Sequence, residues 1–249
     1  IMRASATQPL KKPIKSMGGL IGGEAKKLET HYNKKKNICG DVLQKAMTYA
    51  MAVLEVNASM GLIVAAPTAG SAGVVPGMML ALQECYRISD QRIVDALFNA
   101  GAVGYLAMRN ATVAGAVGGC QAEVGAASGM AAAALVDIKG GTAEQCAEAF
   151  AMALTNLEGL VCDPVAGLVE IPCIKRNVIG AMNAVSAADM ALAGVVGHIP
   201  ADEVIDAMAE VGNAMSKDLR ETGIGGLAGT PTGRAICEIV TMDNGEEED

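Results

Sequence analysis

Apolar residues recur along this chain mostly at the spacing of helix turns, and strict alternation of apolar and polar residues is nearly absent. The first pattern is typical of amphipathic helices, whereas alternation would indicate strands with one buried face. Dense runs of β-branched or aromatic residues are also missing. The pattern therefore predicts an all-α fold, with helices expected at about 41–63, 76–86, 89–97, 142–157, 177–196, 202–215 and after Pro231.

Two further segments, 101–117 and 122–136, are rich in Ala, Val and Gly and have no polar face. A helix that is apolar all round is normally buried on every side. We therefore expect both segments to be wholly buried helices.

The stretch between Glu55 and Glu84 carries no charge and is longer than the ~20 residues that a bilayer requires. It contains Pro67 and Pro76 together with four glycines. A lipid-facing helix would leave backbone groups unpaired at such breaks. We therefore predict two helices joined by a buried loop, and no membrane span.

No linker and no repeat of fixed period divides the chain, so we predict one helical domain over 1–249, with buried loops rich in glycine and proline. Residues 1–16 contain several lysines and no apolar period, and we expect a loose arm there. Residues 242–249 are expected to form a solvated acidic tail. The chain starts at Ile1 rather than Met, which leaves open whether it is a fragment of a longer protein.

Composition narrows the class of protein. The aromatic content is 2% against 51% hydrophobic residues, so Ala, Val, Leu, Ile and Met must fill the core. The net charge of −8 argues against nucleic acid or an anionic membrane as a partner. Seven cysteines, an odd number, follow no signal-peptide pattern. We expect a reduced, cytoplasmic setting with free thiols.

Three of the cysteines lie where glycine or proline breaks a buried helical run: Cys120 follows Gly118-Gly119, Cys162 precedes Asp163-Pro164, and Cys173 follows Pro172. Three thiolates can hold an iron–sulfur cluster and leave one iron open. Buried cysteine is also common as plain packing, and no Cys-x-x-Cys pair is present, so spacing alone leaves metal binding and packing equally open. The other four cysteines, at 39, 85, 146 and 237, are interpreted as structural.

Other polar groups are sparse. The loop Pro67-Thr68-Ala69-Gly70-Ser71-Ala72-Gly73 can present amides and hydroxyls to a carboxylate, or it is a plain turn between helices. The two histidines, His31 and His198, do not assemble into a catalytic triad or a metal-binding motif. A general base is then a lysine, or it belongs to another chain.

The segments 16–25, 67–76, 118–130 and 159–177 resemble the α chain of bacterial iron–sulfur-dependent L-serine dehydratases (L-serine ammonia-lyases). That resemblance implies a [4Fe–4S] cluster on Cys120, Cys162 and Cys173. The open iron would act as a Lewis acid on the serine hydroxyl while a base takes the α-proton, giving pyruvate and ammonia, a step of amino-acid degradation and gluconeogenesis.

The resemblance also implies a substrate site. Thr68, Gly70 and Ser71 would bind the serine carboxylate or amine, and Asn57 is a weaker candidate for the same pocket. A set of polar residues follows the last ligand, Cys173, in the sequence. These residues would hold the carboxylate or balance the cluster charge, unless they only cap a helix at the surface: Lys175, Arg176 and Asn177.

Two departures from the family pattern matter. The acidic end of the chain lacks the terminal cysteine with which some single-chain relatives occupy the open iron. The Ser-Ser-His-Thr-x-Gly-Pro type segment of the family's β domain is also absent. We therefore expect a separate β chain that supplies the base, a hetero-oligomer, and little activity from this chain alone.

Three alternatives remain at this stage. One is a related iron–sulfur lyase on another small amino acid, such as a cysteine desulfidase. Another is a pyridoxal-phosphate dehydratase, against which the lack of strands counts. The last is a non-catalytic all-α interaction subunit whose cysteines are core packing. The sequence leaves the preferred amino acid, the base, a monovalent-cation requirement and the stoichiometry open.

Overall fold

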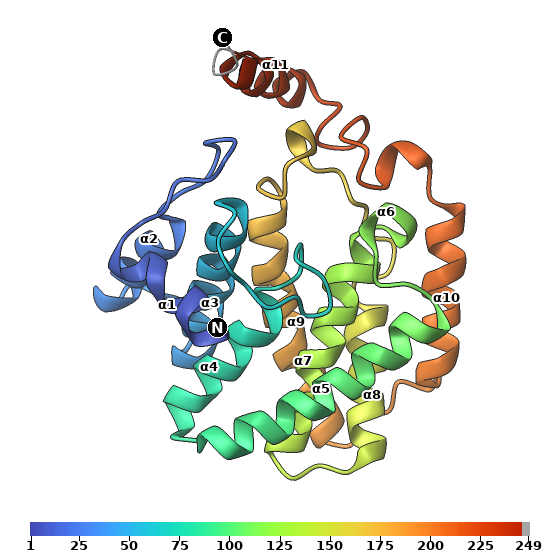
Figure 1. Ribbon diagram of the computed structural model, residues 1–249. Helices are drawn as coiled ribbons and strands as arrows, with labels where there is room; N and C mark the ends of the chain where they lie inside the picture. Colours follow the sequence, from blue (N-terminus) through green and yellow to red (C-terminus); the bar gives the residue numbers. More distant parts are fainter. Residues whose placement is uncertain (246–249) are drawn as a thin grey trace.

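A computed structural model describes residues 1–245, and it builds them from helices and loops (Figure 1). Within this range the backbone forms no strand, only one isolated bridge between Cys162 and Arg220. The α-helices are α1 (Met2–Lys11), α2 (Glu24–Asn33), α3 (Asp41–Ala58), α4 (Val74–Tyr86), α5 (Asp90–Asn110), α6 (Gly115–Gly118), α7 (Ala126–Ile138), α8 (Ala143–Thr155), α9 (Cys173–Leu192), α10 (Ala201–Ala214) and α11 (Pro231–Gly245). Three short turns complete the set: the π-helical η1 (Gln121–Gly125) and the 3-10 turns η2 (Val165–Gly167) and η3 (Lys217–Leu219). The predicted all-α domain is confirmed.

Local signals set several of the helix starts. The Ser89 hydroxyl accepts a hydrogen bond from the Arg92 N–H at the start of α5. Thr142 and Gln145 cap α8 reciprocally, each side chain binding the backbone of the other. Such caps satisfy N–H groups that the first helical turn leaves unpaired. The starts predicted near residues 89 and 142 are therefore confirmed.

Helix α7 is the centre of the core, where it packs against α5, α8 and α9. Every residue from Ala126 to Val136 is buried, as expected for the second apolar segment. Small side chains allow the neighbouring helices to come close. A Cβ on Gly129 would lie 2.4 Å from the Phe150 ring of α8, so only glycine fits at this crossing.

Helix α5 corrects the prediction for the first apolar segment, 101–117. Its inner side is buried against α7, but Phe98, Tyr105 and Met108 expose 74%, 53% and 52% of their surface. The helix also ends at Asn110, before the segment does. Composition alone did not distinguish a helix buried all round from one whose outer side is apolar and exposed.

The N-terminal residues do not form the loose arm that was predicted for 1–16. Residues Met2–Lys11 form α1, which packs against α3 together with α2. The buried side of α1 consists of only a few residues, Ser5, Ala6 and Leu10 among them. Because so short a run shows no clear apolar period, the sequence pattern missed a helix that tertiary packing stabilises.

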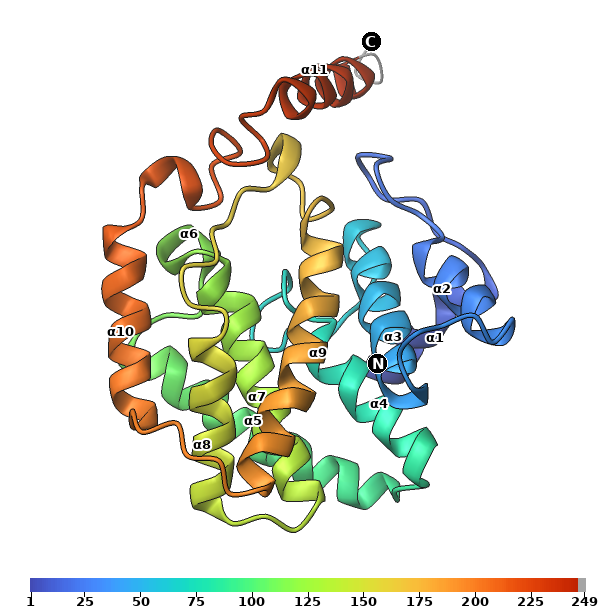
Figure 2. The same cartoon turned by 180° about the vertical axis from the view of Figure 1, so that it is seen from behind.

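At the other end, α11 projects from the body of the molecule and contacts it at η2 (Figure 2). Residues 242–245 of the predicted acidic tail form its last turn, and Met242 is exposed. The remainder of that tail, 246–249, lies outside the described residues. The uncharged stretch between Glu55 and Glu84 is divided by the loop between α3 and α4, as predicted. None of the described helices is both long and apolar enough to cross a membrane.

Candidate metal centre

Cys120 lies directly before η1, at the junction between α6 and α7. Gly119 has a φ of +76°, and a Cβ there would lie 2.9 Å from the Leu160 carbonyl oxygen, so the turn into Cys120 requires glycine. Gln121 holds the turn from the other side, donating to the Met208 carbonyl at 2.9 Å and accepting from the Gly159 N–H at 2.8 Å. Single π-helical turns are frequent at functional sites, and this one points a buried thiol inward.

Cys162 is held by an extended segment from far along the chain. Its N–H donates to the Leu219 carbonyl at 2.8 Å, and its carbonyl accepts from the Glu221 N–H at 2.7 Å. Its side chain is buried, with 3% exposure. The segment after η3 therefore fixes the second cysteine, which no local sequence signal indicated.

Cys173 is the first residue of α9, directly after Pro172. The loop from Cys162 turns back on itself, with the Val165 N–H donating to the Ile171 carbonyl at 2.8 Å. All three cysteines predicted from the sequence are thus buried and held by defined backbone contacts.

The functional groups of Cys120, Glu123 and Cys162 lie within 4.8 Å of one another. Glycine makes room for them: a Cβ at Gly115 would lie 2.6 Å from the Glu123 carboxylate and 3.2 Å from the Cys162 sulfur. Glu123 is not among the site residues that the sequence predicted. Its position three residues after Cys120, one helical turn away, was the signal that it would share the site.

The thiols are coupled electrostatically. A hydrogen bond from the Cys162 thiol lowers the pKa of Cys120, with help from the nearby Arg176 charge, and the same bond raises the pKa of Cys162. Burial, together with the Cys120 charge, raises the pKa of Cys173 to about 12. Burial also raises the pKa of Glu123. Burial and neighbouring charge thus shift the pKa values of these four groups in different directions.

Arg176 supplies the positive charge. Its guanidinium lies 2.7 Å from an Asp163 carboxylate oxygen and donates to the Val161 carbonyl at 2.7 Å. The two charged side chains expose only 15% and 4% of their surface. Burial works against the charged guanidinium, but the Cys120 and Asp163 charges raise its pKa. The alternative that Arg176 only caps a helix at the surface is therefore wrong, because its side chain is largely buried and ion-paired.

The loop between α3 and α4 lies beside the thiols. The Thr68 hydroxyl donates to Glu123 at 2.7 Å and is 3.0 Å from the Ser71 hydroxyl. Asn177 joins the loop to α9, donating to the Gly70 and Cys173 carbonyls and accepting from the Gly73 N–H at 3.0 Å. Within the described residues, no acceptor lies opposite the amides of three loop residues: Ala69, Gly70 and Ser71.

The remaining predicted residues are placed differently. Lys175 is exposed and makes no contact with the thiols within the described part of the chain. Asn57 is half-buried at the end of α3, with no side-chain hydrogen bond to a described residue. The structure thus brings Thr68, Gly70 and Arg176 to the cysteines, and it gives Asn57 and Lys175 no visible part there.

Glu170 is a buried carboxylate that the sequence interpretation missed. It accepts from the Ser16 hydroxyl at 2.6 Å, the Gly18 N–H at 2.7 Å and the Leu20 N–H at 3.1 Å. The glycine-rich loop 16–23 therefore wraps an internal anion, three residues before Cys173, and fastens the loop that carries this cysteine.

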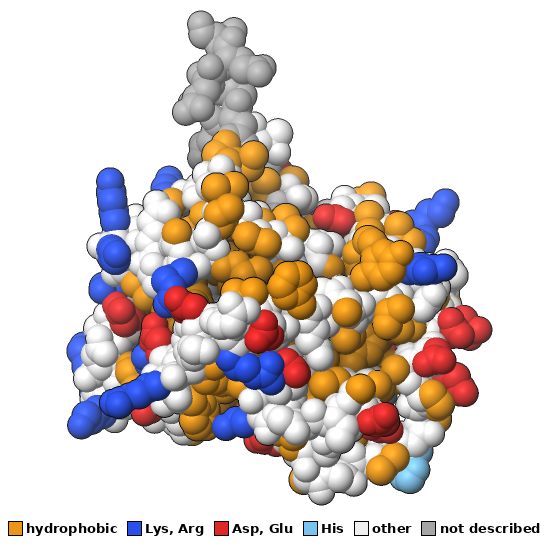
Figure 3. Space-filling model, turned by 60° about the horizontal axis from the view of Figure 1, so that its bottom comes forward, with side chains coloured by type: hydrophobic (Ala, Val, Ile, Leu, Met, Phe, Trp, Pro, Cys, Tyr) orange, Lys and Arg blue, Asp and Glu red, His pale blue; other side chains and the backbone are white. Residues whose placement is uncertain are grey.

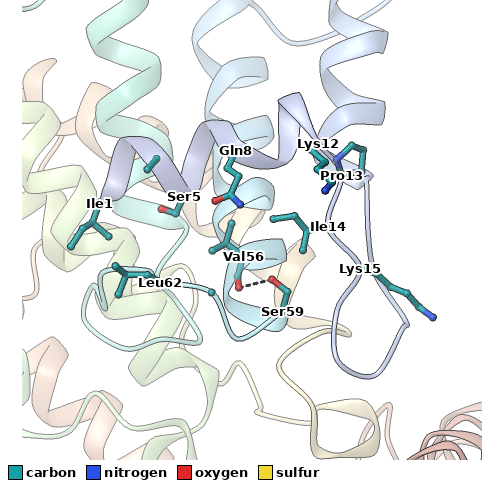
Figure 4. Close-up of a pocket in the computed structure, with 12 residues that line it drawn as sticks. Ile1, Ser5, Gln8, Lys12, Pro13, Ile14, Lys15, Val56, Ser59 and Leu62 are labelled. Carbon is teal, nitrogen blue, oxygen red and sulfur yellow. Dashed lines mark hydrogen bonds between the residues drawn. The ribbon is translucent and has the colours of Figure 1, made fainter.

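A cavity of about 880 Å³ lies away from the thiols, between α1, the following loop and the end of α3 (Figure 4). Its lining includes Ile1, Ser5, Gln8, Val56 and Leu62, and it contains no cysteine. In Figure 4 the Lys15 side chain extends away from the other lining groups. The cavity therefore has no part in the candidate metal centre.

The fold and this site define an all-α protein with a buried cluster of cysteines, a carboxylate and a compensating arginine. Residues 1–228 match the family described as serine dehydratase alpha chain, and the chain belongs to this family. The resemblance inferred from its motifs is confirmed.

Individual relatives agree with this assignment. The chain is 55% identical over 236 residues to the "Probable L-serine dehydratase, alpha chain" of Bacillus subtilis (strain 168), covering 95% of this chain and 78% of that one. It is 51% identical over 236 residues to the L-serine dehydratase, alpha chain, of Peptoniphilus asaccharolyticus, covering 95% and 81%. With the L-serine dehydratase TdcG of Escherichia coli (strain K12) it shares 44% over 182 residues, 72% of this chain but 40% of that longer one.

Proposed function

We propose that this chain is the catalytic α subunit of an L-serine ammonia-lyase, with a [4Fe–4S] cluster held by Cys120, Cys162 and Cys173. The observation that carries the proposal is the convergence of the buried Cys120 and Cys162 thiols with Glu123, beside a loop with unpaired amides. Asn177 links that loop to Cys173. Thiolates are the ordinary protein ligands of iron–sulfur clusters.

The residues present fit such a group. Gly115 leaves open the space between Glu123 and Cys162 that a side chain would fill. The lone Arg176 guanidinium, held by Asp163, compensates part of the negative charge that several thiolates would bring. When bound, a cluster with one open iron supplies a Lewis acid for the departing serine hydroxyl.

The chain's own residues would hold the amino acid. The amides of Ala69, Gly70 and Ser71 have no acceptor among the described residues and are available to bind a carboxylate. Asn177 holds this loop at a fixed distance from Cys173, and Thr68 aligns Glu123 with it. Lys175 and Asn57 stay weaker candidates for substrate contact.

The names of the Bacillus and Peptoniphilus relatives as alpha chains support a separate β chain as partner. The longer Escherichia coli relative supports the same division, because this chain spans 40% of it. We infer that the β chain supplies the proton-abstracting base and that the active unit is a cytoplasmic hetero-oligomer. Comparing activity in sodium and potassium buffers tests whether the enzyme requires a monovalent cation.

The decisive experiment is iron and acid-labile sulfide analysis after anaerobic purification of the parent and of Cys120→Ser, Cys162→Ser and Cys173→Ser. We expect about four of each per parent chain and loss of the cluster's visible absorbance in every variant. Cys85→Ser, which changes a half-buried cysteine on α4, is the matched control and should keep the cluster.

Turnover then separates the remaining functions. Pyruvate and ammonia from serine, in the presence of the β chain, support the proposal, whereas sulfide from cysteine would identify a desulfidase with the same centre. A parent chain that takes up no iron on reconstitution, yet folds and binds its partner, would instead be the non-catalytic interaction subunit.

A further inference from the structure

The outer side of α5 is apolar and has no covering element in the described part of the chain. Its members, together called the α5 outer face, are Val94, Asp95, Phe98, Gly101, Ala102, Tyr105, Leu106, Met108 and Arg109. No charged residue occurs between Asp95 and Arg109. In Figure 3, hydrophobic side chains form a broad area on the side of the molecule where α5 lies. Apolar areas of this kind mark interaction sites.

Gly101 has no explanation within the folded chain. No atom of residues 1–245 lies within 4 Å of the position that a Cβ would occupy there, so none of these residues requires glycine. Glycine weakens a helix relative to alanine. Gly104, in contrast, faces Met130 of α7, whose sulfur would lie 2.6 Å from an added Cβ. A small residue on the exposed side is explained if another backbone approaches α5 there.

The charges on the α5 outer face are arranged symmetrically about Ala102. Asp95 precedes it by seven residues, and Arg109 follows it by seven. Within the described residues neither side chain takes part in an ion pair. Two copies of α5 that run antiparallel, with a two-fold axis at Ala102, would place each Asp95 opposite the partner's Arg109, about 10 Å from the axis at about 1.5 Å per residue.

The same axis matches the apolar positions. Phe98 precedes Ala102 by four residues and Leu106 follows it by four, so each Phe98 would lie against the partner's Leu106. Leu106 lines an apolar groove of about 480 Å³ between α5, α8 and α10, whose floor includes Val103 and Phe150. The most exposed aromatic ring of the α5 outer face would thus enter a hole on the partner, and the reverse contact would follow by symmetry.

We propose that the α5 outer face is a self-complementary interface that joins two copies of this chain through antiparallel α5 helices crossing at a shallow angle. Positions 95, 98, 102, 106 and 109 follow one another at intervals of three or four residues, so they lie along one side of the helix and can face a partner helix. The charge pattern favours a second copy over a different partner, because an unrelated surface would not require opposite charges at equal distances from one small residue.

Sedimentation velocity of the anaerobically purified chain tests the interface, with a species of twice 25.3 kDa expected for the parent. Asp95→Arg and Arg109→Asp each place like charges opposite one another twice per dimer. Each should raise the dissociation constant roughly tenfold or more. The double variant Asp95→Arg/Arg109→Asp restores opposite charges and should return to within about threefold of the parent.

Two further variants complete the design. Phe98→Ala should weaken the dimer by roughly tenfold or more, because it removes the central ring. Asp189→Arg, on the exposed side of α9, adds the same charge change elsewhere and should leave the dimer unchanged. Circular dichroism confirms that each variant is folded.

Three outcomes would overturn the proposal. One is a parent chain that stays monomeric at tens of micromolar. Another is a dimer that the single charge reversals do not affect, or that the double reversal fails to restore. The last is a monomeric parent whose Phe98→Ala variant loses capture of a co-expressed β chain, which would make the face a site for that chain instead.

Discussion

Helices α5 and α7 have similar compositions and different surroundings. Both are rich in Ala, Val and Gly, and the sequence predicted that both would be wholly buried. α7 is buried from Ala126 to Val136, whereas α5 buries one side against α7 and exposes Phe98 and Tyr105 on the other. Burial of α7 is completed within this chain, because α5, α8 and α9 surround it. For α5, the apolar composition includes a surface that the described part of the chain leaves exposed.

The glycines of the two helices make the same contrast at atomic scale. Gly129 lies under the Phe150 ring, Gly104 faces the flexible Met130 side chain, and Gly101 faces open space. Adding one methyl group at each position therefore measures how tightly each side of each helix is packed.

Gly129→Ala should have the largest effect. The added Cβ would lie 2.4 Å from a Phe150 ring that is itself 2% exposed and has no room to move. Overpacking of this kind costs about 3 kcal/mol of unfolding free energy, which urea denaturation measures. In a Phe150→Leu background the same substitution should cost at least about 1 kcal/mol less. Equal costs in both backgrounds would contradict the proposed clash.

Gly104→Ala should cost less, about 1 kcal/mol of unfolding free energy. The added methyl group meets the Met130 sulfur at 2.6 Å, but an unbranched thioether side chain adapts at moderate cost, and alanine favours the helix. The control is the same change in a Met130→Ala background, where the methyl group has room and should no longer destabilise. A loss as large as that at Gly129 would show that α5 and α7 are packed with equal rigidity.

Gly101→Ala should have the opposite sign. No atom lies near the new Cβ, so the monomer should gain about 0.5–1 kcal/mol from helix propensity. The measurement is urea unfolding in the Asp95→Arg background, where the charge reversal is expected to disrupt the dimer and leave the monomer. Sedimentation of Gly101→Ala alone should show a weaker dimer. A destabilised monomer would mean that another part of the chain covers this face.

Phe98→Ala should change the unfolding free energy of the monomer by less than about 0.5 kcal/mol, because the ring is 74% exposed. The Asp95→Arg background again isolates the monomer. Phe150→Ala, which empties a buried site on α8, is the contrasting variant and should cost about 3–5 kcal/mol. Similar costs for the two phenylalanines would remove the distinction between the inner and outer sides.

Much of the fold could be predicted from local patterns. Helical spacing identified the all-α class, and Ser89 and Thr142 marked helix starts that the structure confirms. Helix α1 was not predicted, because its burial depends on a few residues that contact α3 rather than on a visible apolar period. The helix α11 also continues into the predicted acidic tail, through residues 242–245, which the charge run did not indicate.

For the candidate site, too, the sequence predicted individual residues but not the contacts between them. Breaks in buried runs identified Cys120, Cys162 and Cys173, and motif resemblance indicated the loop containing Thr68 and Gly70. The contacts that assemble them join residues far apart in the chain, as with Asn177 and Gly70 or Cys162 and Leu219. Spacing within a segment carries no information about such pairs, because chain folding alone brings them together.

By itself, the sequence determined the helical class, the family and the identity of the three buried cysteines. These depend on short-range spacing and on motifs that survive in a linear string. The tertiary structure decided that Glu123 and Arg176 share the cysteine site and that Lys175 is exposed. It also decided that the described residues leave one side of α5 uncovered. Burial, charge pairing and close approach are properties of neighbours in space, and for these residues most neighbours come from distant parts of the chain.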